Sequence, residues 1–188
     1  GLSEVELDRN YAVVISTNAG LWRYIIGDTI KFSSLNPYRI TVSGRTKHFI
    51  NAFGEEVIIE NAERALKTAC TKAKAEVLEY TAAPIYMNDK ESGAHQWLIE
   101  FSKEPADLDF FAHVLDQSLK ELNSDYEAKR HKNMALKPPL VVAAKKGIFY
   151  KWLKEKGKLG GQHKVPRLAN NRIYMDELLG INHLQAAG

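Results

Sequence analysis

A change of hydrophobic periodicity close to residue 45 constrains the fold of this chain more than any other feature. Before it, short β-rich stretches separated by turn residues cover 11–17, 21–26, 29–33 and 38–43. After it, apolar residues recur every three or four positions, at Ile58 or Ile59, Ala62, Leu66, Ala69 and Ala73. That spacing marks one face of a helix. The sequence therefore predicts two parts, with a junction at Arg45–His48.

The first part, residues 1–46, is predicted to be a small β-subdomain. Asn18-Ala19-Gly20 supplies a tight turn between the first two strands, Gly27-Asp28 turns or bulges the chain, and Asn36-Pro37 marks a loop. Four short strands bury too little apolar surface to fold alone. We therefore expect this part to be the trailing β-subdomain of an N-terminal domain that is incomplete here.

The second part, residues 47–188, is predicted to be an α+β domain. It should form an α/β sandwich with helices on one side of a mainly antiparallel sheet. Helices are expected at 57–74, 108–123 and 148–156, with a helix or a loop at 125–132. Strands are expected at 48–52, 77–87, 97–102 and 140–144, the second of them bent or broken near Pro84. Trp97, Ile99 and Phe101 alternate along one strand and should lie in the core.

A carboxylate and a guanidinium stand out in the first part. Asp28 follows Gly27 at a strand end, and Arg45 comes 17 residues later. An ionised carboxylate only accepts hydrogen bonds, and the two adjacent hydroxyls of a ribose can donate to it together. The guanidinium fork suits ribose and phosphate oxygens. The pair favours a nucleotide site, although Gly-Asp is also a common turn and an isolated arginine is commonly a solvated surface residue.

Two stretches carry a resemblance to a known family. The strand Trp22-Arg23-Tyr24-Ile25-Ile26-Gly27-Asp28, followed by Gly44-Arg45-Thr46-Lys47, resembles the domain junction of adenylate-forming enzymes. Within them, Asn18-Ala19-Gly20-Leu21-Trp22-Arg23-Tyr24 and Gln162-His163-Lys164-Val165-Pro166-Arg167 most resemble the acyl-acid amido synthetases, the auxin-responsive Gretchen Hagen family. The resemblance runs from about Tyr11 to Leu179 and corresponds to about the last third of such an enzyme.

This resemblance implies the C-terminal part of an ATP-dependent enzyme. Such an enzyme adenylates a carboxylic acid and transfers the acyl group to an amine such as an amino acid. Residues 47–188 would be a lid for the enzyme's own N-terminal adenylation domain, which would hold the acyl pocket and the phosphate loop. These residues alone would be inactive. The closest alternative is an acyl-CoA ligase, in which a thiol accepts the acyl group.

The resemblance also implies roles for individual residues. ATP would bind with Mg²⁺, the nucleotide contacting Asp28, Arg45 and Tyr24 and the metal being held mostly by groups outside this chain. Lys164 would be catalytic, contacting the carboxylate and the α-phosphate during adenylate formation. Lys47 would be the hinge residue between the domains.

Each lysine has a simpler interpretation beside the implied one. Val165 precedes a proline and is pushed towards extended geometry, so the ammonium of Lys164 can reach a phosphoryl oxygen as charge builds up on it. Without its flanking motif, Lys164 would be one more lysine in a basic region, and Lys47 a solvated charge. His163 could act as a base beside Lys164 or be a surface histidine.

One stretch departs from the family pattern. Gly54-Glu55-Glu56 stands where many plant members of the family carry an Asp-Lys pair near the nucleotide. The departure argues against a plant-like nucleotide contact from this loop, and it leaves the substrate class open.

Charge is distributed unevenly along the chain. Residues 1–128 carry 13 Lys+Arg and 20 Asp+Glu, whereas residues 129–188 carry 13 and 3. The basic third suits ATP, the acidic remainder of its own protein, or nucleic acid. In the last case the chain would be a non-catalytic nucleic-acid-binding module whose aromatic residues at 149, 150 and 152 stack on bases. Phe149 and Trp152, however, have the spacing of a helix face that packs into a core.

Other classes of protein are not favoured. The six histidines lack paired ligand spacing and there is one cysteine, so no metal site is expected within these residues. No apolar run approaches the roughly 20 residues of a membrane span, and no signal-peptide pattern opens the sequence. We expect a cytoplasmic protein with neither a nucleic-acid nor a membrane partner.

Overall fold

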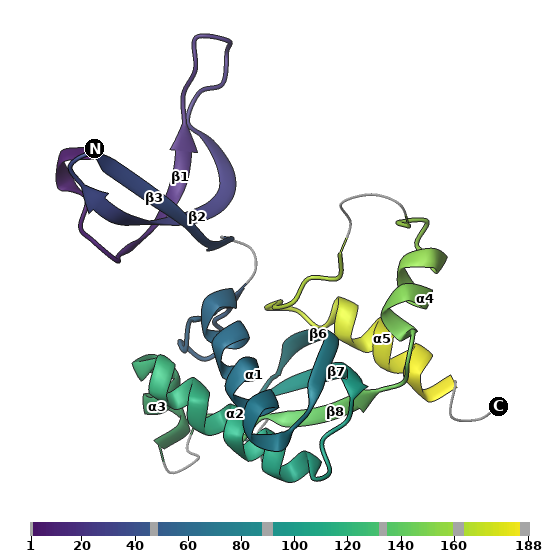
Figure 1. Cartoon of the computed structure of the whole chain (residues 1–188). Coiled ribbons are helices and arrows are strands. Elements are labelled where there is room, and N and C mark those ends of the chain that lie inside the picture. Colours follow the sequence, from purple (N-terminus) through teal and green to yellow (C-terminus); the bar gives the residue numbers. More distant parts are fainter. Residues whose placement is uncertain (1, 46–48, 88–91, 132–134, 160–163, 185–188) are drawn as a thin grey trace. The chain divides into compact units, whose positions relative to one another are not determined.

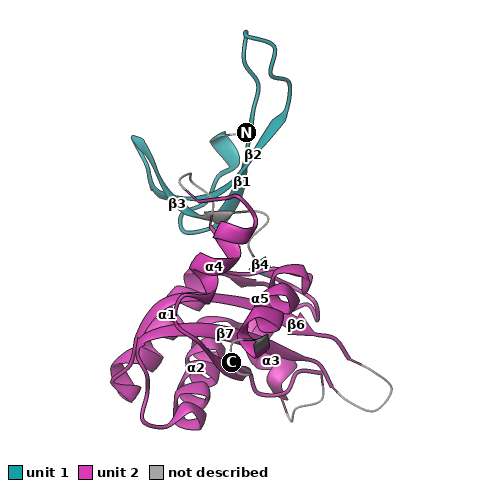
Figure 2. Cartoon of the chain, turned by 90° about the vertical axis from the view of Figure 1, so that its right-hand side faces the viewer, with its two compact units in different colours: residues 1–49 teal, residues 50–188 magenta. Residues whose placement is uncertain are grey.

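A computed structural model describes residues 2–45, 49–87, 92–131, 135–159 and 164–184. The chain divides into two compact units, unit 1 (residues 1–49) and unit 2 (residues 50–188), which are coloured separately in Figure 2. The predicted boundary at residues 46 and 47 and the predicted hinge residue Lys47 lie outside the described residues. The assignment of residues 1–46 to an N-terminal domain therefore stays a prediction.

Unit 1 contains an antiparallel three-stranded sheet in the order β1-β2-β3. A short 3₁₀ turn, η1 (Leu2–Glu4), precedes β1 (Asn10–Ile15), β2 (Tyr24–Leu35) and β3 (Tyr38–Arg45). Separate strands were expected before and after Gly27-Asp28, but β2 continues through them as one strand. Ala12 and Val14 of β1 pair with Thr29 and Ile25, so three β2 residues stand opposite one β1 residue. Gly27, with a φ of 93°, lies in this β-bulge.

Little of unit 1 is buried. Phe32 packs edge-on against the rings of Tyr11 and Tyr38, at centroid distances of 5.8 and 5.9 Å. It is the one buried side chain among those that the structure describes in this unit. Large apolar side chains of this unit are exposed, including Ile25 of β2, Val42 of β3 and Trp22 of the connection between β1 and β2. The expectation that this part has little core of its own agrees with these exposures.

Unit 2 is built on a second three-stranded sheet (Figure 1). It opens with the short pair β4 (Phe49–Ile50) and β5 (Val57–Ile58), and its sheet has the order β6-β7-β8. β6 (Glu76–Ile85) and β7 (Ala94–Lys103) are antiparallel, whereas β8 (Leu140–Ala144) runs parallel to β7. The helices are α1 (Ile59–Ala73), α2 (Leu108–Leu122), α3 (Ser124–Arg130), α4 (Ile148–Glu155) and α5 (Ile173–Leu184).

Helices cover both faces of this sheet. One core contains Trp97, Ile99 and Phe101 of β7 and packs against α1 and α2. The other contains Leu98 of β7 and packs against α4, α5 and Val165. The α+β class with a mainly antiparallel sheet is confirmed, but the expectation of helices on one side only was wrong. α4, which was predicted as a helix at 148–156, and α5, which was not predicted, both pack on the second face.

The remaining differences concern element ends. Pro84 does not break β6, because β6 lies at an edge of its sheet, where a missing backbone donor is tolerated. α2 begins one residue after Asp107, whose side chain accepts a hydrogen bond from the backbone N–H of Phe110 at 2.9 Å. The uncertain stretch after Asn123 is helical, with Asn123 as the N-cap of α3.

Candidate functional site

The predicted nucleotide-binding residues share one region of unit 1. Asp28 lies half-buried on β2, directly after the bulge at Gly27. The pairing of β2 with β3 places the Cα of Arg45 opposite that of Asp28, and Gly44 opposite Thr29. Tyr24, four residues before Asp28 on the same strand, is 53% exposed. The sheet thus brings together two residues that are far apart in the sequence.

Lys164 begins a stretch of extended chain in unit 2, here called the lysine segment (residues 164–169). The Lys164 side chain is exposed, while the next residue, Val165, is 4% exposed and packs into the core that contains α4 and α5. Leu168 is fully buried in the other core. Gln162 and His163 lie outside the described residues. The exposed ammonium therefore sits next to a firmly packed anchor.

The lysine segment pairs with the free edge of β6. The hydroxyl of Thr81 donates to the carbonyl of Pro166 at 2.7 Å. The N–H of Ala82 donates to the carbonyl of Arg167 at 2.8 Å, and the N–H of Ala169 donates to the carbonyl of Ala82 at 3.1 Å. Leu168 forms a parallel bridge with Ala82. The segment behaves as a short added strand, which fixes the backbone on the C-terminal side of Lys164.

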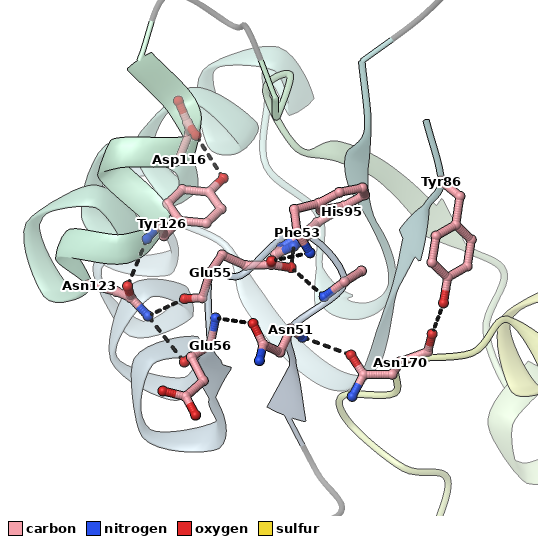
Figure 3. A network of polar contacts seen from close by, with 11 residues as sticks. Asn51, Phe53, Glu55, Glu56, Tyr86, His95, Asp116, Asn123, Tyr126 and Asn170 are labelled. Atoms are coloured by element: carbon pink, nitrogen blue, oxygen red, sulfur yellow. Dashed lines mark hydrogen bonds and ion pairs between the residues drawn. The ribbon is translucent and has the colours of Figure 1, made fainter. Parts of the chain in front are cut away.

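The loop that departs from the family pattern is held from inside (Figure 3). The Glu55 carboxylate is buried and accepts hydrogen bonds from the backbone N–H groups of Ala52, at 3.2 Å, and Phe53, at 2.7 Å. It also meets Nε2 of buried His95 at 2.8 Å. Burial alone would raise the pKa of Glu55, but the hydrogen bond and charge of His95, with the backbone donors, leave that pKa below its usual value. Glu55 therefore supports the fold, and sequence reasoning missed this role.

A second set of contacts joins this loop to the residue after the lysine segment (Figure 3). The N–H of Asn51 donates to Oδ1 of Asn170 at 2.7 Å, and the hydroxyl of Tyr86 donates to the Asn170 carbonyl. Asn123 closes the other side, donating to the carbonyls of Glu55 and Glu56 at 2.9 and 3.2 Å. Residues 119 positions apart are thus linked, which no local sequence pattern indicates.

The aromatic residues of α4 do not form a stacking platform. Phe149 and Trp152 are each 3% exposed and lie in the core with Met175 and Leu178 of α5. The Trp152 indole donates to Glu177 at 2.7 Å. Only Tyr150 of the three aromatic residues on this helix is exposed. This packing removes the aromatic stacking platform that the nucleic-acid alternative invoked beside the basic charge.

Among the described residues, no three His, Cys, Asp or Glu side chains gather in a way that could hold a metal ion. In the same part of the chain, no helix combines the length and the apolar character that crossing a bilayer requires.

Two solved structures with the same fold are named as acyl acid amido synthetases. The structure of "GH3.15 acyl acid amido synthetase" matches 97% of this chain and 34% of its own, with a TM-score of 0.74 and 20% identity. Another, "AtGH3.15 acyl acid amido synthetase in complex with 2,4-DB", matches 96% of this chain with a TM-score of 0.71 and 19% identity. At these identities the match establishes the fold.

Sequence comparison establishes the family. The model of the GH3 family C-terminal domain matches residues 60–173, and that of the GH3 family central domain matches residues 1–45. The chain belongs to the GH3 family, the auxin-responsive Gretchen Hagen family. It is 31% identical to jasmonoyl–L-amino acid synthetase GH3.5 of Oryza sativa subsp. japonica, over 90% of this chain and 30% of that protein. It is 25% identical to indole-3-acetic acid-amido synthetase GH3.10 of Arabidopsis thaliana, over 94% of this chain and 31% of that protein. The chain spans about a third of the length of these relatives.

Proposed function

We propose that this chain is the central and C-terminal part of an ATP-dependent acyl-acid amido synthetase. Such an enzyme joins a carboxylic acid to an amine, with an amino acid as the expected acceptor. The proposal rests on family membership together with the lysine segment. In this segment Lys164 is part of the late family motif, its side chain is exposed, and the backbone after it is held by β6. The GH3 relatives are named for forming jasmonoyl and indole-3-acetyl conjugates.

The residues in unit 1 fit a nucleotide. Asp28 would accept hydrogen bonds from the ribose hydroxyls, because a half-buried carboxylate next to a bulge is both accessible and oriented. Arg45, opposite it on β3, would meet ribose or phosphate oxygens, and Tyr24 would contact the nucleotide with its exposed ring. Lys47 would be the hinge between the two units. The Mg²⁺ that accompanies ATP would be held mostly by residues outside this chain.

Lys164 would act in the first half-reaction. Adenylation joins the substrate carboxylate to the α-phosphorus and releases pyrophosphate, and negative charge develops on the phosphoryl oxygens during the displacement. An ammonium placed against those oxygens stabilises the transition state more than the bound substrates. In the second half-reaction an amine replaces AMP, and Lys164 has no necessary part in it.

The exposed apolar side chains of unit 1 are expected to pack against another part of the enzyme. Trp22, Ile25 and Val42 are between 61% and 81% exposed, which is more than an isolated sheet in water would favour. We assign their cover to the enzyme's own N-terminal adenylation domain, since the relatives are about three times as long as this chain. We further propose a cytoplasmic enzyme without nucleic-acid or membrane partners.

The test uses the full-length protein that contains these residues. ATP–pyrophosphate exchange is measured with a panel of carboxylic acids that includes jasmonic acid, indole-3-acetic acid and 2,4-DB. Acids that support exchange are then offered amino acids or coenzyme A. Exchange followed by amide formation is expected. Exchange followed by a thioester and no amide would make the protein an acyl-CoA ligase. The absence of exchange, with nucleic-acid binding that falls steeply between about 50 and 200 mM salt, would favour the binding module.

A further inference from the structure

Arg167 is the last residue of the late family motif, and the proposed chemistry gives it no role. Its guanidinium forms an ion pair with Glu63 of α1 and lies over the ring of Tyr80 of β6, with Cζ 5.4 Å from the ring centroid. Tyr80 is 3% exposed, and its hydroxyl donates to the same Glu63 oxygen at 2.9 Å. Arg167 therefore joins the lysine segment to a helix and a strand through its side chain.

These contacts hold the segment three residues from Lys164. The backbone of Arg167 is already paired with Ala82, and the carbonyl of Pro166 with Thr81. The side-chain contacts add a polar restraint towards α1 to the packing of Leu168 in the core that α1 shares. Burial raises the pKa of Tyr80, and the charge and hydrogen bond of Glu63 raise it further, so this hydroxyl stays protonated as a donor at neutral pH.

The cluster lies at the surface of unit 2 and not in its core. The side chains of Arg167 and Glu63 are 36% and 44% exposed. They line an open pocket of about 360 Å³, together with Leu66, Lys67 and Cys70 of α1. Since truncation of Arg167 would enlarge this open pocket without leaving a buried void, the fold should tolerate the change. Because the variant should still fold, the effect of losing the Arg167 side chain on the action of Lys164 can be measured.

We propose that Arg167 is a positioning residue that sets the place of Lys164 in the adenylation step, through its ion pair with Glu63 and its stacking on Tyr80. This inference rests on the proposed function of Lys164. Small displacements of a catalytic group cost rate steeply, on the order of a hundredfold for about 1 Å. A looser segment should therefore slow the step that needs the ammonium and spare the step that does not.

The experiment compares two half-reactions in the full-length protein. Arg167→Ala is expected to lower ATP–pyrophosphate exchange on the order of tenfold, with aminolysis of presynthesised acyl-adenylate within about twofold of wild type. The acid used is the one with the fastest exchange among jasmonic acid, indole-3-acetic acid and 2,4-DB. Arg167→Lys keeps the positive charge but loses the guanidinium fork and the stacking on Tyr80. Its exchange rate should lie between those of wild type and Arg167→Ala. Tyr80→Phe keeps the ring and loses one hydrogen bond, so it should cost less than Arg167→Ala.

Arg64→Ala is the matched control. Arg64 lies on α1 one residue after Glu63 and pairs with Glu60 at 3.9 Å, with its side chain 63% exposed. The substitution removes an arginine–glutamate pair from the same helix. Among the hydrogen bonds and ion pairs of the described residues, none joins Arg64 to the lysine segment. Exchange by this variant should match wild type. A loss equal to that of Arg167→Ala would overturn the proposal.

The double variant separates positioning from general damage. In a Lys164→Ala background, Arg167→Ala should cause no further loss of exchange, because the group that it positions is gone. A tenfold loss in both backgrounds, or equal losses in both half-reactions, would overturn the positioning role. Normal exchange by Arg167→Ala beside impaired exchange by Lys164→Ala would overturn it while leaving the proposed function intact. Normal exchange by Lys164→Ala alone would remove the lysine assignment, and the role of Arg167 with it.

Discussion

Two carboxylates of this chain have opposite surroundings. Asp28 is half-buried beside a bulge on β2, whereas Glu55 is enclosed and accepts three hydrogen bonds within unit 2. A carboxylate whose oxygens are already occupied by backbone N–H groups and a histidine has little left for a ligand. The neighbours of Glu55 thus give it a structural role, whereas binding remains the proposed role of Asp28.

Asp28→Asn should weaken ATP binding by the full-length protein. The amide keeps the shape but offers one acceptor and two donors to hydroxyls that need acceptors, so a loss of about 1.5–3 kcal/mol is expected. Isothermal titration with ATP measures it. Asp8→Asn, at an exposed carboxylate of the same unit, is the control and should bind normally. Unchanged affinity in Asp28→Asn would reject the ribose assignment.

Glu55 should make the free energy of unfolding depend on pH in the acidic range. Its pKa in the folded chain lies below the ordinary value of 4.5, so its ionised form adds stability above that pH, which is lost as the pH falls through the folded pKa. Glu55→Gln should cost about 1–3 kcal/mol at neutral pH and flatten the decline of stability below pH 4.5.

Urea unfolding at a series of pH values measures both effects on this chain. Glu56→Gln is the control, because the side chain of Glu56 is exposed and only its backbone takes part in the network. An acid response in Glu55→Gln as steep as that of wild type would show that other groups carry the pH dependence.

At the scale of elements, a buried ionic cluster joins α2 to α3. Asp116 accepts hydrogen bonds from the Tyr126 hydroxyl at 2.8 Å and from Nε and Nη2 of Arg130 at 2.7 and 2.8 Å. Lys120 approaches it at 2.8 Å. Burial would raise the pKa of Asp116, but these donors leave it lowered. The cluster therefore requires an ionised carboxylate.

Asp116→Asn should be the most destabilising of these substitutions. It removes the negative charge that Arg130 meets in the interior, at a cost of about 3–5 kcal/mol. The midpoint of urea unfolding would fall accordingly, while Glu121→Gln, at an exposed position on the same helix, should leave it unchanged. A midpoint close to wild type in Asp116→Asn would mean that Arg130 finds another partner or water.

Elements with a single apolar stripe could be predicted from the sequence. α1, α2 and α4 each bury one face, and their periodicity located them to within a few residues. α5 escaped because its apolar residues, from Ile173 to Leu184, run around the helix and leave no polar face to define a period. Without α5, the prediction contained only α4 of the two helices that pack over Leu98.

Contacts between distant residues could not be predicted. The pair of Glu55 and His95 spans 40 positions, and it depends on how β7 lies beside the loop before α1. The parallel direction of β8 and the added strand of the lysine segment depend on tertiary packing in the same way. For the site, sequence motifs named Asp28, Arg45, Tyr24 and Lys164, while the structure added the anchors of the lysine segment.

At the scale of the whole molecule, the two units have different kinds of surface. Unit 1 exposes apolar strand residues, whereas residues 129–188 of unit 2 carry an excess of positive charge, with 13 Lys+Arg against 3 Asp+Glu. The proposed enzyme uses both, because the first surface would be covered by the adenylation domain and the second would face the anionic nucleotide. The most specific claim concerns Lys164, whose ammonium is proposed to act in the adenylation step.

Lys164→Ala in the full-length protein tests that claim through two assays on one variant. Pyrophosphate exchange should fall strongly while ATP affinity changes little, because the ammonium acts mainly in the adenylation transition state. Aminolysis of a presynthesised acyl-adenylate should stay within about tenfold of wild type, a difference of about 1.4 kcal/mol. Normal exchange in Lys164→Ala would contradict the account, and equal losses in both assays would show that Lys164 serves the fold or both steps.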